Sequence, residues 1–78
     1  MDTRSKAVRA MIRSMAPSQS VPFIQGFYLP AAEEQALICV DCYDYSIVKT
    51  AGIIHLSPDR TKVKRRIALS KIAKALNL

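Results

Sequence analysis

The stretch SPDRTKVKRR, residues 57–66, decides how the fold of this chain is interpreted. Five of its ten residues are Arg or Lys, and it opens with Ser57, Pro58 and Asp59. Ser and Asp are favoured helix caps, and Pro is tolerated in the first turn because its missing N–H would be unpaired there anyway. We therefore predict a helix from about Asp59 to Leu76, capped by Ser57 or Asp59, whose first turns carry most of its positive charge.

The apolar pattern of this last helix changes partway along it. Val63 and Ile67 define one face, whereas a second apolar set lies roughly half a turn away at about 100° per residue. This second set contains Leu69, Ile72, Ala73 and Leu76. We predict an unbroken helix whose second half meets a different surface. A second copy of the chain is one candidate for that surface, with residues 68–78 as the dimer interface.

Three earlier segments also have the properties of helices. Residues 3–15 and 31–43 carry apolar residues at helical spacing, and Ser46 can cap a short helix that ends near residue 54. The apolar positions are Val8, Met11, Ile12 and Met15 in the first segment, and Ala36, Leu37, Val40 and Tyr43 or Cys39 in the second. Together with the basic last helix, these segments predict an all-α fold, a small bundle of about four helices.

Residues 17–30 contain three of the four prolines and one of the two glycines. Such a composition indicates a Pro-containing connector. We expect Phe23, Ile24, Phe27 and Tyr28 to hold it on the core. The predicted organisation is a basic N-terminal helix or arm over 1–16, the connector over 17–30, and a helix-turn-helix domain over 31–78.

Positive charge is concentrated at the two ends of the chain. The net charge is +6, made of +3 in residues 1–16, −4 in residues 17–59 and +7 in residues 60–78. Segregated positive charge of this kind favours a nucleic acid or an acidic protein surface as partner. We expect both basic ends to contact phosphates, the first as an interaction arm.

The composition also bears on the compartment of the protein. Its longest apolar runs fall short of the roughly 18 to 20 residues that cross a bilayer, and Arg9 and Arg13 interrupt the apolar part of the N-terminus. We expect a cytoplasmic protein without membrane association. In that compartment Cys39 and Cys42 stay reduced.

A short helix, a short turn and a basic helix form the order of a helix-turn-helix. In such a unit the second helix enters the major groove with its N-terminal residues nearest the base edges, and the short helix contacts the DNA backbone. We predict that Val63 and Ile67 hold the second helix on its scaffold. The predicted DNA-binding residues are Arg60, Thr61, Lys62, Lys64, Arg65 and Arg66 of the last helix, with Ser46 and Lys49 of the short helix.

Residues 29–67 resemble region 4 of bacterial sigma factors and the related helix-turn-helix of phage late antiterminators of the Q type. The matching elements are Leu29-Pro30, Glu33 or Glu34, Ser46, Thr50-Ala51, Leu56-Ser57 and Thr61-Lys62-Val63-Lys64. The resemblance implies a bacterial or phage protein of transcription regulation that binds promoter DNA and docks on RNA polymerase. Val63 lies two residues further from Ser57 than the family pattern, so the turn is longer or Asp59 is the cap.

A second hypothesis is a protein–protein adaptor or inhibitor that uses the same scaffold to dock on RNA polymerase or another acidic protein surface. An enzyme is not expected, because His55 and the acids form no catalytic arrangement. Cys39 and Cys42 form a C-x-x-C pair, but zinc sites need about four ligands. We therefore interpret both as small apolar helix residues and expect no metal and no cofactor.

Overall fold

The computed structural model describes residues 3–78, which contain only helices and the turns between them. The elements are α1 (Thr3–Ser14), α2 (Pro17–Gln25), α3 (Ala31–Leu37), the π-helical segment η1 (Ile38–Cys42), α4 (Ile47–Ile54) and α5 (Pro58–Ala75). The predicted all-α class is confirmed, with five α-helices in place of about four. Residues 1–2 of the expected N-terminal arm lie outside the described residues.

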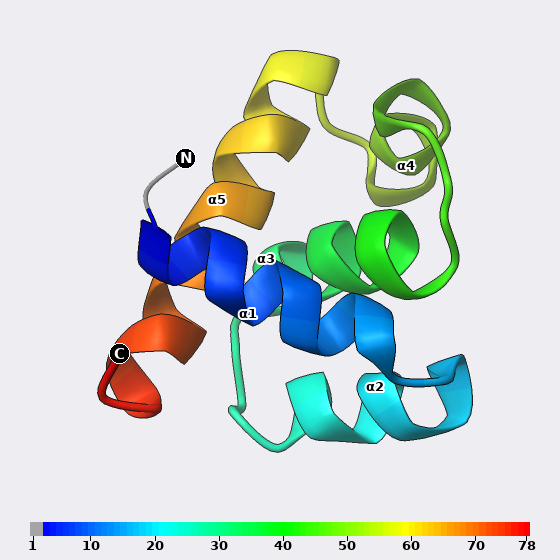
Figure 1. The fold of residues 1–78 in the computed structure, drawn as a ribbon. Coiled ribbons are helices and arrows are strands. Elements are labelled where there is room, and N and C mark those ends of the chain that lie inside the picture. Colours follow the sequence, from blue (N-terminus) through cyan, green and yellow to red (C-terminus); the bar gives the residue numbers. More distant parts are fainter. Residues whose placement is uncertain (1–2) are drawn as a thin grey trace.

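Figure 1 shows how these helices are arranged. α1 crosses in front of α3 and α5, α4 lies beside the N-terminal half of α5, and α2 lies below α1. α3 and α5 share the most extensive contact, followed by α1 and α5. The predicted N-terminal helix is therefore not a detached arm but one of the walls of the core.

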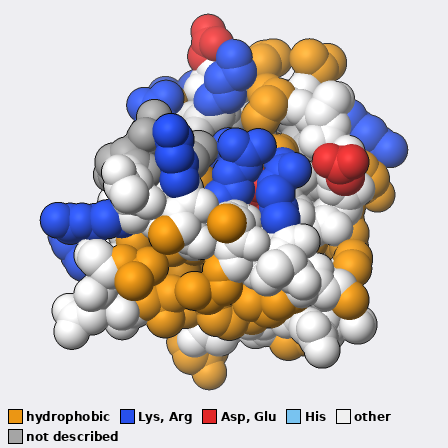
Figure 2. All heavy atoms as spheres, in the orientation of Figure 1, with side chains coloured by type: hydrophobic (Ala, Val, Ile, Leu, Met, Phe, Trp, Pro, Cys, Tyr) orange, Lys and Arg blue, Asp and Glu red, His pale blue; other side chains and the backbone are white. Residues whose placement is uncertain are grey.

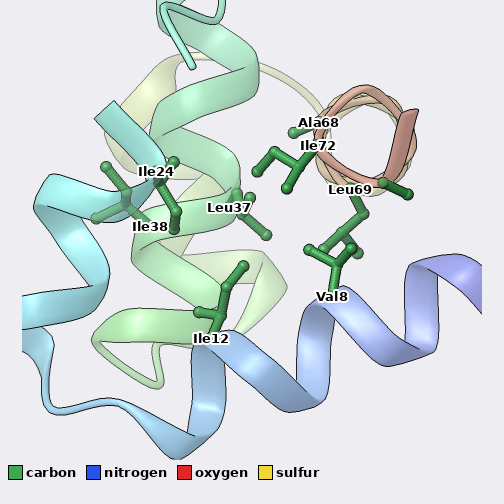
Figure 3. Packing of buried hydrophobic residues seen from close by; sticks show 9 residues of the cluster. Val8, Ile12, Ile24, Leu37, Ile38, Ala68, Leu69 and Ile72 are labelled. Atoms are coloured by element: carbon green, nitrogen blue, oxygen red, sulfur yellow. The ribbon is translucent and has the colours of Figure 1, made fainter. Parts of the chain in front are cut away.

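The core forms where α1, α3 and α5 meet, with α2 closing one side. Figure 3 shows Val8 of α1 pointing towards Leu69 of α5, and Ile12 pointing towards Leu37 of α3. The buried cluster consists of Val8, Ile12, Ile24, Leu37, Ile38, Ala68, Leu69, Ile72 and Ala73. Burial of each large aliphatic side chain stabilises the fold by about 1.5–3 kcal/mol before the loss of conformational entropy.

The second apolar set of α5, in the second half of the helix, packs against the core of the same chain. The helix is unbroken to Ala75, and Leu69 and Ile72 are fully buried against the other helices of the same chain. The prediction of an unbroken helix is thus confirmed. The apolar residues that motivated a dimer interface over 68–78 are occupied within the chain.

Residues 17–25 of the expected Pro-containing connector form a helix, α2, which we did not predict. Pro17 occupies the first helical turn, and Pro22 lies inside a helix of only nine residues. Ser20 and Ile24, one helical turn apart, are both buried. Because helices in proteins owe most of their stability to packing of one face, this burial outweighs the hydrogen bond that Pro22 removes.

Two side chains expected in the core are exposed. Tyr28 is 91% exposed and has a φ of 52°, whereas Phe23 and Phe27 pack against the core as expected. Val63 is 44% exposed. It precedes Ile72 by nine residues, which at about 100° per residue places it on the opposite side of α5.

The turn between α4 and α5 consists of His55, Leu56 and Ser57. His55 ends α4 in the left-handed conformation, with a φ of 59°. Ser57, and not Asp59, caps α5: its Oγ accepts a hydrogen bond from the N–H of Arg60 at 3.2 Å. The alternative in which Asp59 caps the helix is therefore wrong, because α5 begins directly after Ser57.

Candidate nucleic-acid interface

A buried carboxylate joins the two basic ends of the chain. Asp41 of η1 has a fully buried side chain, and three arginines surround it. Arg65 of α5 donates from Nε to Oδ2 at 2.6 Å and from Nη2 to Oδ1 at 2.9 Å. Arg13 of α1 donates from Nε to Oδ1 at 3.1 Å, and the Nε of Arg9 lies 3.5 Å from the same oxygen. We call these four residues the Asp41 cluster.

Asp41 belongs to the segment of net negative charge, residues 17–59, yet its side chain is fully buried. Asp41 follows Leu37 by four residues, so both lie on one side of the helix that continues from α3 into η1. An acid on an apolar stripe predicts a buried carboxylate, which requires cationic partners. This signal was present in the sequence and identifies Asp41, although not which arginines bind it.

The same geometry corrects the role of Arg65. We expected it to contact bases or phosphates, but its side chain is only 14% exposed and two of its nitrogens bind Asp41. A bidentate pairing of this kind fixes the plane of the guanidinium. Arg65 therefore holds α5 onto η1 and is not placed to contact a base edge.

Thr61 is also turned away from solvent. Its side chain is fully buried, and its Oγ1 donates a hydrogen bond to the carbonyl oxygen of Ser57 at 2.9 Å. It follows Ser57 by four residues and precedes Ala68, also buried, by seven, so it lies on the inward face of α5. The expectation that Thr61 contacts a base edge is wrong for this reason.

The remaining basic residues of the N-terminal half of α5 spread around its solvent side, because residues two positions apart lie about 200° apart on a helix. We call this set the α5 basic face. Arg60, Lys62 and Arg66 are exposed, and Lys64 is half-buried. Within residues 3–78 none of the four is in an ion pair. Figure 2 shows Lys and Arg side chains concentrated in the upper half of the molecule, the level of α4 and the start of α5 in Figure 1.

Ser46 and Lys49 at the start of α4 were predicted to contact the DNA backbone. Both are exposed, and they are already engaged with their own helix. The Oγ of Ser46 accepts a hydrogen bond from the N–H of Lys49 at 3.0 Å and caps α4. The Nζ of Lys49 lies 4.0 Å from the ring centroid of Tyr45, a cation–π contact. Lys49 thus keeps its charge at the surface in a fixed place.

Sequence reasoning missed a depression beside the Asp41 cluster. Lys6, Arg9, Ala10 and Arg13 line it, all from α1, and its volume is about 300 Å³. The side chains of Arg9 and Arg13 are 42% and 41% exposed, so their outer edges face solvent while their Nε atoms face Asp41.

The C-x-x-C pair lies inside the fold. Cys39 is buried, Cys42 packs against the core, and both are free thiols. Burial raises the pKa of both thiols, and the nearby charge of Asp41 adds to the increase at Cys42. Among the residues the structure describes, no group of three or more His, Cys, Asp or Glu side chains could hold a metal ion. Nor does any described helix have the length and apolarity to cross a membrane.

Comparisons with protein-family models, with curated proteins and with solved structures found no match to this chain.

Proposed function

We propose that this protein is a sequence-dependent DNA-binding regulator of transcription, in which α4 and α5 act as a helix-turn-helix. The observation that carries the proposal is the α5 basic face. Its four cations lie in the N-terminal half of α5, after a turn of three residues from α4, and have no acidic partner within residues 3–78. Unpaired cations at the start of the second helix suit phosphates and base edges of a major groove.

The exposed side of α5 revises which residues contact DNA. Arg60, Lys62 and Arg66 take the place of Thr61 and Arg65 as the side chains nearest the groove. Val63 lies among them and is 44% exposed. An apolar side chain on such a face can contact the methyl group of thymine. The resemblance to sigma region 4 supports the same assignment, because it places the recognition helix in this stretch.

The experiment is binding of the purified protein to random duplex DNA and to the DNA upstream of its own gene, each at two salt concentrations. We expect tighter binding to the upstream DNA, a steep loss of affinity with salt, and strong weakening in the double variant Lys62→Ala/Arg66→Ala.

The matched control is Arg4→Ala/Lys74→Ala, which removes the same charge at the other end of the molecule. Arg4 of α1 and Lys74 of α5 line a small pocket with Ser70 and Ala73 of the C-terminal half of α5. We expect this control to bind nearly as well as the wild type. The proposal fails if the wild type binds neither DNA at low salt, or if both double variants lose affinity equally.

A second candidate is the protein–protein adaptor or inhibitor that docks on RNA polymerase or another acidic protein surface. The observation that favours it is the exposed side of α4, where Val48 is 71% and Ile53 46% exposed. Gly52 lies between them, and a methyl group there would meet nothing within 4 Å. Exposed apolar side chains on a helix beside a basic helix suit a protein surface of mixed character. A salt-sensitive complex with purified polymerase, without DNA binding at low salt, would identify this function.

A further inference from the structure

We infer that the depression lined by Lys6, Arg9 and Arg13 is a second anion site, which binds a backbone phosphate of the DNA held by the α5 basic face. The inference rests on the proposed function and extends it, because it adds a defined phosphate subsite on α1. Our sequence analysis expected the basic N-terminus to contact phosphates, but it named none of these three residues as DNA-binding.

The first support is the charge balance of the Asp41 cluster. Three guanidinium groups share one carboxylate, which leaves an excess of two positive charges beside the ammonium group of Lys6. The other buried acid, Glu33, is balanced by a single cation: the Nζ of Lys71 lies 2.8 Å from its Oε1. Excess charge therefore accumulates at the Asp41 cluster, and an anion at the depression would offset part of it.

The second support is the placement of the two arginines by Asp41, which accepts a hydrogen bond from Arg13 and pairs with Arg9 by charge alone, because the Nε of Arg9 makes no hydrogen bond. Asp41 engages Arg13 through its Nε at 3.1 Å and lies 3.5 Å from the Nε of Arg9. No partner of their Nη groups occurs within residues 3–78. Guanidinium groups held in place lose less entropy on binding, and their free edges match the oxygens of a phosphate. The depression thus presents preorganised donors to solvent.

The third support is the continuity of the depression with α5. Arg13 and Arg65 both bind Oδ1 of Asp41, at 3.1 and 2.9 Å, so their guanidinium groups are neighbours. Arg65 lies in sequence between Lys64 and Arg66 of the α5 basic face. The depression is therefore next to the proposed groove-binding helix, where a phosphate flanking the groove would lie.

The test uses Lys6→Gln with Arg4→Gln as its matched control. Lys6 and Arg4 are exposed residues of the same helix, and each substitution removes one positive charge. They lie roughly 200° apart around α1, so only Lys6 lines the depression. Long-range effects of net charge are nearly equal in the two variants.

The measurement is the slope of log affinity for duplex DNA against log salt concentration. Loss of one phosphate contact reduces that slope by about 0.9. A fourfold rise in salt then weakens the wild type about 3.5-fold more than Lys6→Gln. We expect this difference for Lys6→Gln and almost none for Arg4→Gln.

Three outcomes are distinct. A reduced slope in Lys6→Gln alone supports the subsite. Steep, salt-dependent binding by the wild type with equal slopes in both variants overturns the subsite and leaves the DNA-binding proposal standing. Absence of DNA binding by the wild type overturns both.

Discussion

The Asp41 cluster and the α5 basic face use the same residue types for opposite purposes. Arg65 is 14% exposed and bound to a buried carboxylate, whereas Arg66, the next residue, is exposed and unpaired within residues 3–78. Successive residues of a helix point about 100° apart, which here separates a group that binds Asp41 of η1 from one that faces solvent. Density of positive charge in a sequence therefore does not by itself locate a binding surface.

The comparison also shows what a buried acid can do for a small protein. α1, η1 and α5 are brought together by apolar packing, which is not directional. Asp41 adds direction, because its two oxygens accept hydrogen bonds from arginines of two different helices. We infer that it fixes the relative register of α1 and α5, and thereby the position of both basic surfaces.

The largest expected effect comes from Asp41→Asn. Removing the carboxylate leaves the poorly exposed Arg65 without a counter-charge, and breaking a buried ion pair from one side costs about 3 kcal/mol. Urea denaturation followed by circular dichroism measures this loss. The control is Asp44→Asn, an exposed acid for which we expect a change within about 0.5 kcal/mol. Equal, small losses in the two variants would show that the cluster does not stabilise the fold.

Arg65→Ala and Arg66→Ala test the comparison most directly, because the two residues are adjacent. We expect Arg65→Ala to lower the free energy of unfolding by about 2 kcal/mol, since two charge-assisted hydrogen bonds are lost and Asp41 loses its nearest partner. Arg66→Ala should change stability by less than about 0.5 kcal/mol.

At temperatures where both variants are folded, Arg66→Ala should weaken DNA binding more than Arg65→Ala. Arg66→Ala removes a proposed contact with DNA, whereas Arg65→Ala removes a side chain that holds α5 onto η1. The DNA affinity of Arg66→Ala should therefore depend less steeply on salt than that of Arg65→Ala. If Arg65→Ala reduced the slope more than Arg66→Ala while remaining folded, our division of the charges would be wrong.

Much of this fold follows from local rules that a sequence displays. Ser46 and Ser57 are capping residues before apolar or basic periodic segments, and both cap helices here. The spacing of Val8 and Ile12 predicts the buried face of α1, and both are fully buried. These features depend on residues within a few positions of one another, which is why pattern reasoning recovers them.

The features that were not recovered depend on contacts between distant segments. α2 contains Pro22 and forms because Ser20 and Ile24 are buried by other elements. Arg65 is held by Asp41, which precedes it by 24 positions. No local pattern encodes such a pairing, so the sequence located the charged stretch but not which of its cations are free.

Gly52→Ala tests whether the exposed side of α4 takes part in binding. A methyl group at position 52 meets nothing within 4 Å, so the variant gains helix propensity without a clash. We expect an increase of about 0.5–1 kcal/mol in the free energy of unfolding, measured by urea denaturation. If the exposed side of α4 lies close to a DNA backbone or a partner protein, affinity should fall although stability rises. Unchanged affinity for both would place α4 outside the interface.

The smallest expected effect concerns the thiols beside the Asp41 cluster. Burial raises the pKa of Cys39 and Cys42 above the ordinary value of 9.0. Because the folded pKa is the higher one, the stabilising contribution is fully present below the unfolded pKa. It is lost as pH rises from there through the folded value.

We therefore expect the free energy of unfolding of the wild type to fall more steeply above about pH 9 than that of Cys39→Ala/Cys42→Ala. Tyrosine and lysine titrations affect both proteins alike and cancel in the difference. Parallel pH profiles would mean that both thiols ionise as readily in the folded as in the unfolded chain. That result would mean that the protein interior beside Asp41 is not desolvated. The desolvation of this region is the reason why Arg65 requires the carboxylate of Asp41 as its partner.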